Sequence, residues 1–468
     1  MRTSPQMARS RSAPPSSSLL WLLVTVFLAG MSPIGAKVVS FAHNGGLKMF
    51  YDNRMYPQAV ALGDEVHIVW RGYAKGYPHL ITYDLQNGKF SEPRNLMIGY
   101  EDQIDPKKYR KDHHYAPVIW SDKDGYLHVL HGCHRTSGLH LISRNPRSTD
   151  AWVRGPDISE SISYPQVHRI YNDRTLLYSR WSGHLGHWRY HISADGGRTW
   201  KESPRPVVDL SGEPQDGIHA SHAGSYHTTA ISADGKRLHV AFIWKVEDLL
   251  YNKRFGRVLH DHVQRYNLYY LWVDLPSGKG HNIAGREVEL PLRKLDADDH
   301  CLVWNTAERP AAVGPSLALD KYDQPHFLLP VSKQDPYTGS FYFVSHVDGG
   351  WRKIPIADTL HPFNSSYLEP GDDGVYYASM ITGRGEAVKR EGMDEYGFGH
   401  RVERWISRDG GARWELERDL SPQPGLRYQG IQFISADMTS KMQDMLLFYG
   451  WQAADTPGRA FLWDGRKR

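Results

Sequence analysis

The sequence predicts an all-β fold, a single seven-bladed β-propeller, from an aromatic-rich composition, Asp-box turns and a hairpin repeated seven times. The 468 residues include 15 Trp and 27 Tyr, and the long Ala/Leu/Glu/Lys runs of helical proteins are missing. A chain of this length allows two or three domains or one large repeat fold. Two cysteines, Cys133 and Cys301, exclude a disulfide framework and leave one optional bridge or two thiols. The repeats therefore decide the fold.

The first 36 residues predict an export signal and not a part of the fold. Three arginines precede an apolar run from Leu19 to Ala29, and small and turn residues follow up to Ala36. We therefore expect a secreted or periplasmic protein in which residues 37–468 form the catalytic propeller. No later stretch is apolar enough to span a bilayer, so we expect no membrane attachment of the mature form.

The charge balance excludes one class of partner. The predicted signal contains three of the 56 basic residues and none of the 52 acidic residues, so the mature chain is nearly neutral. Nothing resembles the clustered Lys/Arg footprint of a nucleic-acid binder. We expect no nucleic-acid partner and a monomeric protein.

Asp-box turns mark the outer parts of the predicted blades. Ser193–Trp200 and Ser407–Trp414 fit the pattern S-x-D-x-G-x-x-W, in which Asp caps the amides of the turn and Gly adopts the left-handed conformation. The Trp of this motif packs between adjacent sheets. His346–Trp351 is a third, degenerate copy. We expect these turns to join outer strands.

Seven segments repeat the order of strand, polar turn and second apolar strand. They are Tyr56–Trp70, Tyr115–Gly132, Tyr164–Arg180, Tyr226–Trp244, Gly314–Val331, Tyr367–Ile381 and Tyr428–Trp451. Each should be the inner pair of a four-stranded blade. Ring closure should use Arg459–Asp464 or the strand from Val38 to Phe41, so that both chain ends meet in one blade. The longest insertion follows the fourth hairpin and should contain strands at Tyr266–Leu275 and Arg286–Leu292.

The hairpins place residues of catalytic type at one mouth of the central channel. The first strand of a hairpin starts at the end where the second strand finishes. The second hairpin thus places His114 and His134 at this rim, and the third places Tyr164 and Arg180 there. Arginine holds carboxylates, histidine transfers protons near neutral pH, and aromatic faces cover pyranose rings. The expected partner is an acidic polysaccharide, with further substrate-binding residues at Arg71, His222 and Tyr226.

The reaction that fits these side chains is β-elimination beside a uronic acid. The proton next to the carboxylate is weakly acidic, so the enzyme must neutralise the carboxylate and stabilise enolate-like charge. Arg180 and His134 would do this. His114 and Tyr164 would be the base and the acid, with the split between them open and His113 as an alternative to His114. A close pair of carboxylates, as most glycoside hydrolases use, is not evident at the rim.

The sequence resembles the BNR-repeat polysaccharide lyases of families 24 and 25, which include seven-bladed ulvan lyases. The resemblance covers nearly the whole mature chain and is carried by DHHYAPVIW with GYLHVLHGCH, by YPQVHRIYNDRTLLYSR and by NLYYLWVDLPSGKGHNIAGREVELPL. It implies that His114 and Tyr164 transfer protons while Arg180 and His134 handle the carboxylate. The expected substrate is a uronate polymer, ulvan-like and sulfated, and the product carries a 4,5-unsaturated uronate end.

Two other functions and a metal site stay open. A sialidase shares Asp boxes, but its early Arg-Ile-Pro signature is absent here and seven hairpins exceed its six blades. A non-catalytic glycan-binding propeller would use the same rim without cleavage.

We expect the elimination to need no cofactor. His262 and Cys301 are ligand types suited to a structural zinc or another divalent ion, against an alternative of solvated loops.

Overall fold

The computed structural model describes residues 37–466 apart from 46–48, 184, 212–222, 249–263, 307–308, 313, 334–337, 384–396, 437–440 and 453–455. The predicted signal, residues 1–36, lies outside the described residues, and export stays a prediction. In the described part the α-helices are α1 (Pro106–Lys111) and α3 (Lys294–His300), and the rest is mostly strand. None of the described helices is long and apolar enough to cross a membrane.

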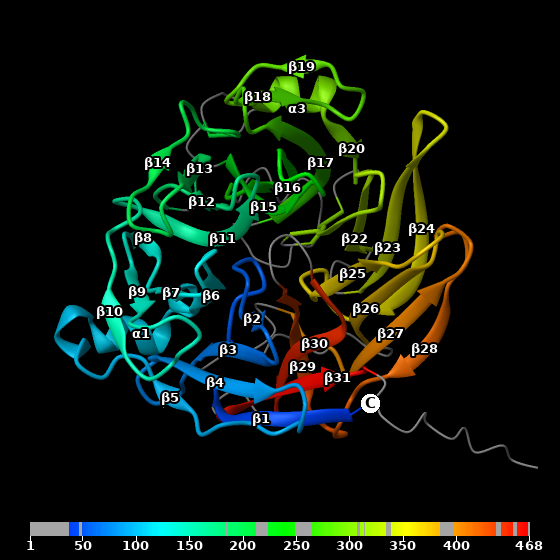
Figure 1. The fold of residues 1–468 in the computed structure, drawn as a ribbon. Coiled ribbons are helices and arrows are strands. Elements are labelled where there is room, and N and C mark those ends of the chain that lie inside the picture. Colours follow the sequence, from blue (N-terminus) through cyan, green and yellow to red (C-terminus); the bar gives the residue numbers. More distant parts are fainter. Residues whose placement is uncertain are drawn as a thin grey trace, which may run out of the picture.

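Antiparallel sheets follow one another around a common centre in chain order (Figure 1). The largest sheet has 8 strands, and it consists of two four-stranded antiparallel halves joined by one parallel bridge between Val60 and Ser435. With its halves counted separately, the described strands form seven antiparallel units. The all-β prediction is confirmed.

Each unit starts with one of the predicted hairpins, and all seven hairpins are present. Their strands are β2 (Ala59–Leu62) with β3 (Glu65–Arg71), β6 (Val118–Ser121) with β7 (Leu127–His131), β11 (Ile162–Ile170) with β12 (Arg174–Arg180), β15 (Ala223–Ile231) with β16 (Arg237–Val246), β21 (Ser316–Leu319) with β22 (Pro325–Ser332), β25 (Ser366–Pro370) with β26 (Tyr376–Thr382), and β29 (Arg427–Ser435) with β30 (Lys441–Trp451). The remaining strands of the units are β4 (Pro78–Asp84), β5 (Arg94–Asn95), β9 (Leu139–Ser143), β10 (Trp152–Arg154), β13 (Trp188–Ser193), β14 (Lys201–Glu202), β17 (Gln264–Asp274), β18 (Lys279–His281), β19 (Glu287–Val288), β23 (Gly339–Val347), β24 (Gly350–Thr359), β27 (Arg401–Ser407) and β28 (Glu415–Asp419). Two short strands pair outside this order: β8 (His134–Thr136) and β20 (Leu302–Trp304).

The two ends of the described chain meet in one sheet, as predicted. β1 (Lys37–Gly45) pairs antiparallel with β31 (Gly458–Asp464), and β31 pairs with β30. Both candidate closing strands are therefore used, and the first described strand becomes the outermost strand of the last unit.

The Asp-box turns lie between outer strands, at β13/β14 and β27/β28, and the degenerate copy lies at β23/β24. Asp409 accepts hydrogen bonds from the backbone N–H groups of Ala412 and Arg413 at 3.1 and 2.9 Å. The Trp414 ring lies 5.4 Å from the Phe343 ring of the preceding unit. The predicted role of this tryptophan between neighbouring sheets is confirmed.

The insertion after the fourth hairpin differs in part from the prediction. The strand predicted at Tyr266–Leu275 is present as β17, whereas the strand predicted at Arg286–Leu292 shrinks to the two residues of β19. Pro291 has no N–H to donate to a strand ladder, and the pairing of β19 with β18 ends before it. Leu292 forms an isolated parallel bridge with Val208 instead, and the chain continues into α3.

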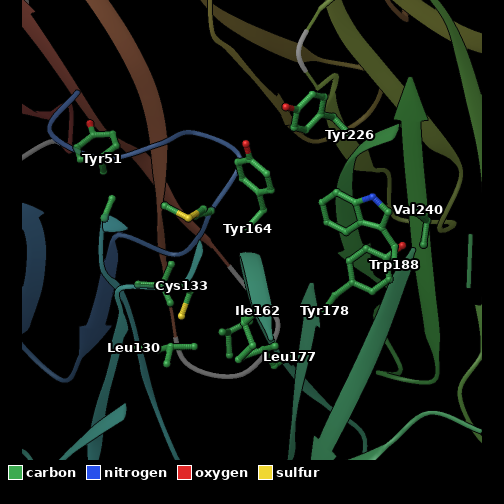
Figure 2. Packing of buried hydrophobic residues seen from close by; sticks show 14 of the residues in the cluster. Tyr51, Leu130, Cys133, Ile162, Tyr164, Leu177, Tyr178, Trp188, Tyr226 and Val240 are labelled. Carbon is green, nitrogen blue, oxygen red and sulfur yellow. The ribbon is translucent and has the colours of Figure 1, made fainter. Parts of the chain in front are cut away.

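Aromatic rings fill the space between units near the centre. Trp188 stacks on Tyr178 at 5.5 Å and on His227 of the next unit at 4.2 Å, and Figure 2 shows the Trp188 and Tyr178 rings together. The Tyr178 hydroxyl lies 2.7 Å from His227 Nδ1. His227 is therefore held within the packing between two units.

The Asp-box glycines supply a stability test. Gly410 and Gly411 have φ of +68° and +80°, but an added Cβ would meet nothing within 4 Å at Gly410 and would lie 2.1 Å from the Phe343 ring at Gly411. We expect Gly410→Ala to cost about 1–2 kcal/mol of unfolding free energy for the left-handed backbone. Gly411→Ala should cost roughly 1–3 kcal/mol more because of the clash. Thermal unfolding followed by circular dichroism checks this, and equal losses would contradict the packing described for this turn.

Candidate functional site

Asp112 lies where the chain turns from α1 into the second unit. Asp105 caps the start of α1, where its side chain accepts from the N–H of Lys107 at 2.9 Å, and Asp112 caps the end of the helix. Asp112 then caps the short 3-10 helix η2 (His113–Tyr115) by accepting from the N–H of His114 at 3.0 Å. These two roles fix the position of the Asp112 carboxylate.

The Asp112 carboxylate bridges two imidazoles. One oxygen lies 2.5 Å from His114 Nδ1 and the other lies 2.5 Å from His134 Nδ1. Burial raises the pKa of Asp112, but the hydrogen bonds from His114 and His134 outweigh it and hold the pKa below its usual value. An ionised carboxylate only accepts, so each imidazole carries its proton on Nδ1 and a neutral ring offers Nε2 as an acceptor.

A phenol faces the acceptor nitrogen of His114. The Tyr164 hydroxyl lies 2.6 Å from His114 Nε2, and it donates because Nε2 accepts. Burial and the neighbouring His113 lower the pKa of His114 well below its usual value. Burial raises the pKa of Tyr164 well above its usual value. A neutral base and a neutral acid thus share one hydrogen bond.

The strand register explains why these residues meet. Ser163 pairs with Arg180 on one side and with His134 of β8 on the other. The register shifts between Ser163 and Gln166, and Tyr164 within this bulge has a φ of +57°. Bulges re-aim side chains, and strained non-glycine residues cluster at functional sites. The bulge therefore turns Tyr164 towards His114, next to Arg180.

A second phenol, Tyr226, lies beside the first. The rings of Tyr164 and Tyr226 are 5.3 Å apart in an edge-on arrangement, and Figure 2 shows the hydroxyl end of Tyr226 turned towards Tyr164. The guanidinium carbon of Arg54 lies 4.6 and 5.1 Å from the two ring centres, and that of Arg180 lies 4.7 and 5.4 Å away. Both arginines are thus shared by both phenols.

Two more cations complete the surroundings of Tyr226. Lys245 Nζ lies 5.4 Å and the guanidinium carbon of Arg265 lies 5.1 Å from the ring centre. Burial raises the pKa of Tyr226, but the four cations outweigh it and hold the pKa well below its usual value. Burial also lowers the pKa of Lys245 to about 8, although Glu247 pairs with it at 2.6 Å. The site favours negative charge at this phenol.

His113, the alternative to His114, occupies a different position. Its Nδ1 lies 2.9 Å from the carboxylate of Asp52, which also forms a buried ion pair with Arg54. Burial raises the pKa of Asp52, but Arg54 and His113 together lower it well below its usual value. His113 thus belongs to the support of Arg54, and His114 is the imidazole that reaches Tyr164.

The accessible edge of the site, called the imidazole edge, is formed by the two imidazoles and the Asp112 carboxylate between them. The side chains of His114, His134 and Asp112 are 12%, 17% and 26% exposed, whereas Tyr164 and Arg180 are fully buried behind them. In the described part of the chain, a ligand therefore meets this edge before it meets the phenol and the guanidinium.

The structure brings five predicted residues together: His114, His134, Tyr164, Arg180 and Tyr226. It does not bring in Arg71, whose fully buried guanidinium donates to the carbonyl oxygens of Met49, Tyr109 and Arg110 at 3.0–3.1 Å. His222 lies outside the described residues.

The sequence interpretation missed five residues of the site: Asp52, Arg54, Asp112, Lys245 and Arg265. Only Asp112 carried a local signal, because it directly precedes the two histidines.

One group in the described part of the chain could hold a metal ion, namely Asp112, His114 and His134, whose ligand atoms lie within 4.8 Å of one another. The two carboxylate–imidazole distances are hydrogen-bond distances with a proton between the atoms, so an ion would have to displace both bonds. Of the predicted metal ligands, His262 lies outside the described residues. Cys301 has a buried, unbridged thiol, and burial raises its pKa to about 12.

Comparisons with known proteins identify relatives. A family model described as a BNR repeat-containing family member matches residues 74–359. The ulvan lyase-PL25 of Pseudoalteromonas sp. (strain PLSV) is 23% identical over 432 residues, which are 87% of this chain and 82% of that protein. The ulvan lyase of Nonlabens ulvanivorans is 24% identical over 264 residues, which are 53% of this chain and 54% of that protein.

Solved structures share the fold. A PL25 ulvan lyase bound to -[GlcA(1-4)Rha3S]- matches with a TM-score of 0.71 and 18% identity, over 92% of this chain and 96% of that one. The polysaccharide lyase Uly1 matches with a TM-score of 0.59 and 13% identity, over 92% of this chain and 100% of that one.

The electrostatics of the two phenols can be tested by titration. The folded pKa of Tyr226 lies below the unfolded value of roughly 10, so its ionised form stabilises the fold above that pH and the gain is lost as the pH falls through the folded pKa. Tyrosinate absorbance should therefore begin to rise at a lower pH in the wild type than in Tyr226→Phe. The matched variant Tyr164→Phe should keep the early rise. An unchanged onset in Tyr226→Phe would show that the four cations do not act on this phenol.

Proposed function

The chain belongs to the BNR repeat-containing family and is distantly related to ulvan lyases, and from this premise we propose that it is a polysaccharide lyase. Its seven antiparallel units are then the blades of one propeller, with residues 37–468 as a single catalytic domain. The fold shared with a PL25 ulvan lyase over most of both chains supports this proposal.

The proposed substrate is a polysaccharide that contains uronic acid, sulfated and ulvan-like. The PL25 ulvan lyase of similar fold holds -[GlcA(1-4)Rha3S]-, which combines a uronate with a sulfated sugar. In this chain Arg54, Arg180, Lys245 and Arg265 gather within 5.4 Å of one ring centre. Such a concentration of buried cations suits the binding of an anionic sugar.

One observation carries the proposed mechanism: the hydrogen bond of 2.6 Å between Tyr164 and a His114 ring whose other nitrogen is held by Asp112. In the first step a base removes the proton beside the substrate carboxylate, while Arg180 stabilises the carboxylate as negative charge develops on it. His134 can join Arg180 only as an imidazolium, which donates from Nε2 while its Nδ1 donates to Asp112. In the second step the bond to the 4-linked oxygen breaks, an acid protonates that oxygen, and a double bond forms between carbons 4 and 5.

The His114–Tyr164 pair supplies both the base and the acid. When His114 is the base, the Tyr164 hydroxyl protonates the leaving oxygen. When Tyr164 is the base, its proton first passes to His114 Nε2, and the imidazolium protonates the leaving oxygen. A glycan-binding protein needs no such pair, and this favours the lyase over a non-catalytic propeller.

Substitution of either member of the pair tests the mechanism. His114→Gln and Tyr164→Phe should each lower kcat roughly 10²–10⁴-fold, measured by the ultraviolet absorbance of the new conjugated double bond on ulvan, chondroitin, heparan and alginate. His43→Gln, at an exposed position, is the control and should keep full activity. Reducing ends on another glycan without this absorbance would indicate a hydrolase of the sialidase type. No cleavage of any glycan would indicate a binding propeller.

We also propose that the elimination requires no cofactor, because Asp112 and the two imidazoles are already joined through protons. Dialysis against EDTA should leave the rate unchanged, and the thermal unfolding midpoint of the dialysed protein will reveal any structural ion elsewhere in the chain. A rate that falls on chelation and returns with zinc would contradict the proton-bridged arrangement.

A further inference from the structure

A cavity of about 290 Å³ lies towards the other end of the central strands. It is lined by the final residues of the innermost strands of several units, such as Thr229–Ile231 of β15, Leu317–Leu319 of β21 and Glu369–Pro370 of β25. On β11 the candidate site uses Tyr164, near the start, and the cavity uses Val167–Arg169, further along. The lining of the cavity includes none of the catalytic candidates His114, His134, Tyr164 and Arg180. A smaller hollow lies between the two places, since its lining contains both Arg54 and Lys441.

A lysine inside this cavity has no close ion pair within the described residues, although the Glu369 carboxylate partly offsets the effect of burial on its pKa. Lys441 Nζ lies 4.3 Å from the Phe433 ring centre and 5.2 Å from the Tyr367 ring centre. Within the described residues, no hydrogen bond or ion pair joins the Lys441 ammonium to another group. Burial lowers the pKa of Lys441 to about 8. A partly buried ammonium with only aromatic faces beside it is incompletely compensated for the water that it has lost.

The acidic group of the cavity is already engaged. The Glu369 carboxylate accepts from Arg404 at 3.1 Å, and Arg404 also binds Glu417 and Asp444 at 2.8 Å each. The other cation of the lining, Arg169, pairs with Asp173 at 3.3 Å. Lys441 is therefore the group through which the cavity would attract an anion.

Hydrogen-bonded polar groups form a further wall. The Tyr56 hydroxyl donates to Gln166 at 2.6 Å, Thr229 donates to the same Gln166 oxygen at 2.7 Å, and His168 Nε2 lies 2.8 Å from the Thr229 hydroxyl. These bonds fix Thr229 and His168 in the lining. A ligand would thus meet one cation, two aromatic faces and rigid polar groups, the combination that binds a hydroxylated carboxylate.

We propose that this cavity is a second binding site, which takes a small carboxylate the size of one sugar, such as a free uronic acid. The carboxylate binds Lys441, and the body of the ligand lies against Phe433 and Tyr367. The volume of about 290 Å³ is close to the lower limit of about 300 Å³ for ligand pockets and suits a ligand the size of one sugar. The site does not depend on the lyase activity, because none of the residues proposed for elimination lines it.

Isothermal titration calorimetry with free glucuronate tests the site. The protein used is the full chain carrying His114→Ala and Arg180→Ala, so that binding at the imidazole edge is removed. In this background Lys441→Met should weaken glucuronate binding on the order of tenfold or more, the loss expected for a hydrogen bond to a charged group. Lys321→Met removes an exposed lysine paired with Asp373 and should change nothing.

A second variant tests whether binding needs the space of the cavity, and two further ligands test whether it needs a sugar carboxylate. Ala230→Leu fills the cavity from β15 and should also abolish binding while Lys441 is intact. Neutral glucose should not bind, and inorganic sulfate should not compete. The proposal is overturned by unchanged affinity in Lys441→Met, by equal binding of glucose, by equal competition from sulfate, or by the absence of glucuronate binding to the double variant.

Discussion

The pairing of β1 with β31 is the constraint on which the ring of sheets depends. It joins the first described strand to the last and covers an edge that would otherwise be open. The chain between β1 and β2 then lies at the centre of the ring, where Tyr51 donates to the Gly430 carbonyl and Tyr56 donates to Gln166. Arg54, in the same segment, reaches both buried phenols. The segment that follows the closing strand therefore also supplies a cation to the site.

The fold could be predicted because its signals are local. A strand, a polar turn and a second apolar strand are visible in each repeat, and antiparallel pairing fixes which ends of a hairpin meet. The same rule brought together His114, His134, Tyr164 and Arg180. It fails for Arg71, which occupies the position equivalent to Arg180 at the end of a second inner strand. There the chain around α1 offers backbone carbonyls, and the guanidinium binds them.

The residues missed by the sequence interpretation come from positions without such a rule. Asp52 and Arg54 lie in an irregular segment, where no periodicity indicates direction. Lys245 and Arg265 are paired residues in β16 and β17, next to a register shift between Phe242 and Trp244. A register shift of one residue moves the following side chains of a strand to the opposite face of the sheet. The face that Lys245 or Arg265 takes therefore depends on this shift. Such shifts leave no mark in composition or spacing.

The Asp112 carboxylate decides what each imidazole offers. Each ring donates a hydrogen bond from Nδ1–H to one carboxylate oxygen, so both rings take the same tautomer. The two rings therefore differ in what surrounds Nε2. For His114 this surrounding is the Tyr164 hydroxyl. Because burial and His113 lower the pKa of His114, this ring stays neutral and can accept the phenol proton. Two histidines that share one carboxylate thereby differ in one respect: His114 accepts the hydrogen bond of a phenol through Nε2, which is the reason why it is the proton-transfer partner in the proposed mechanism.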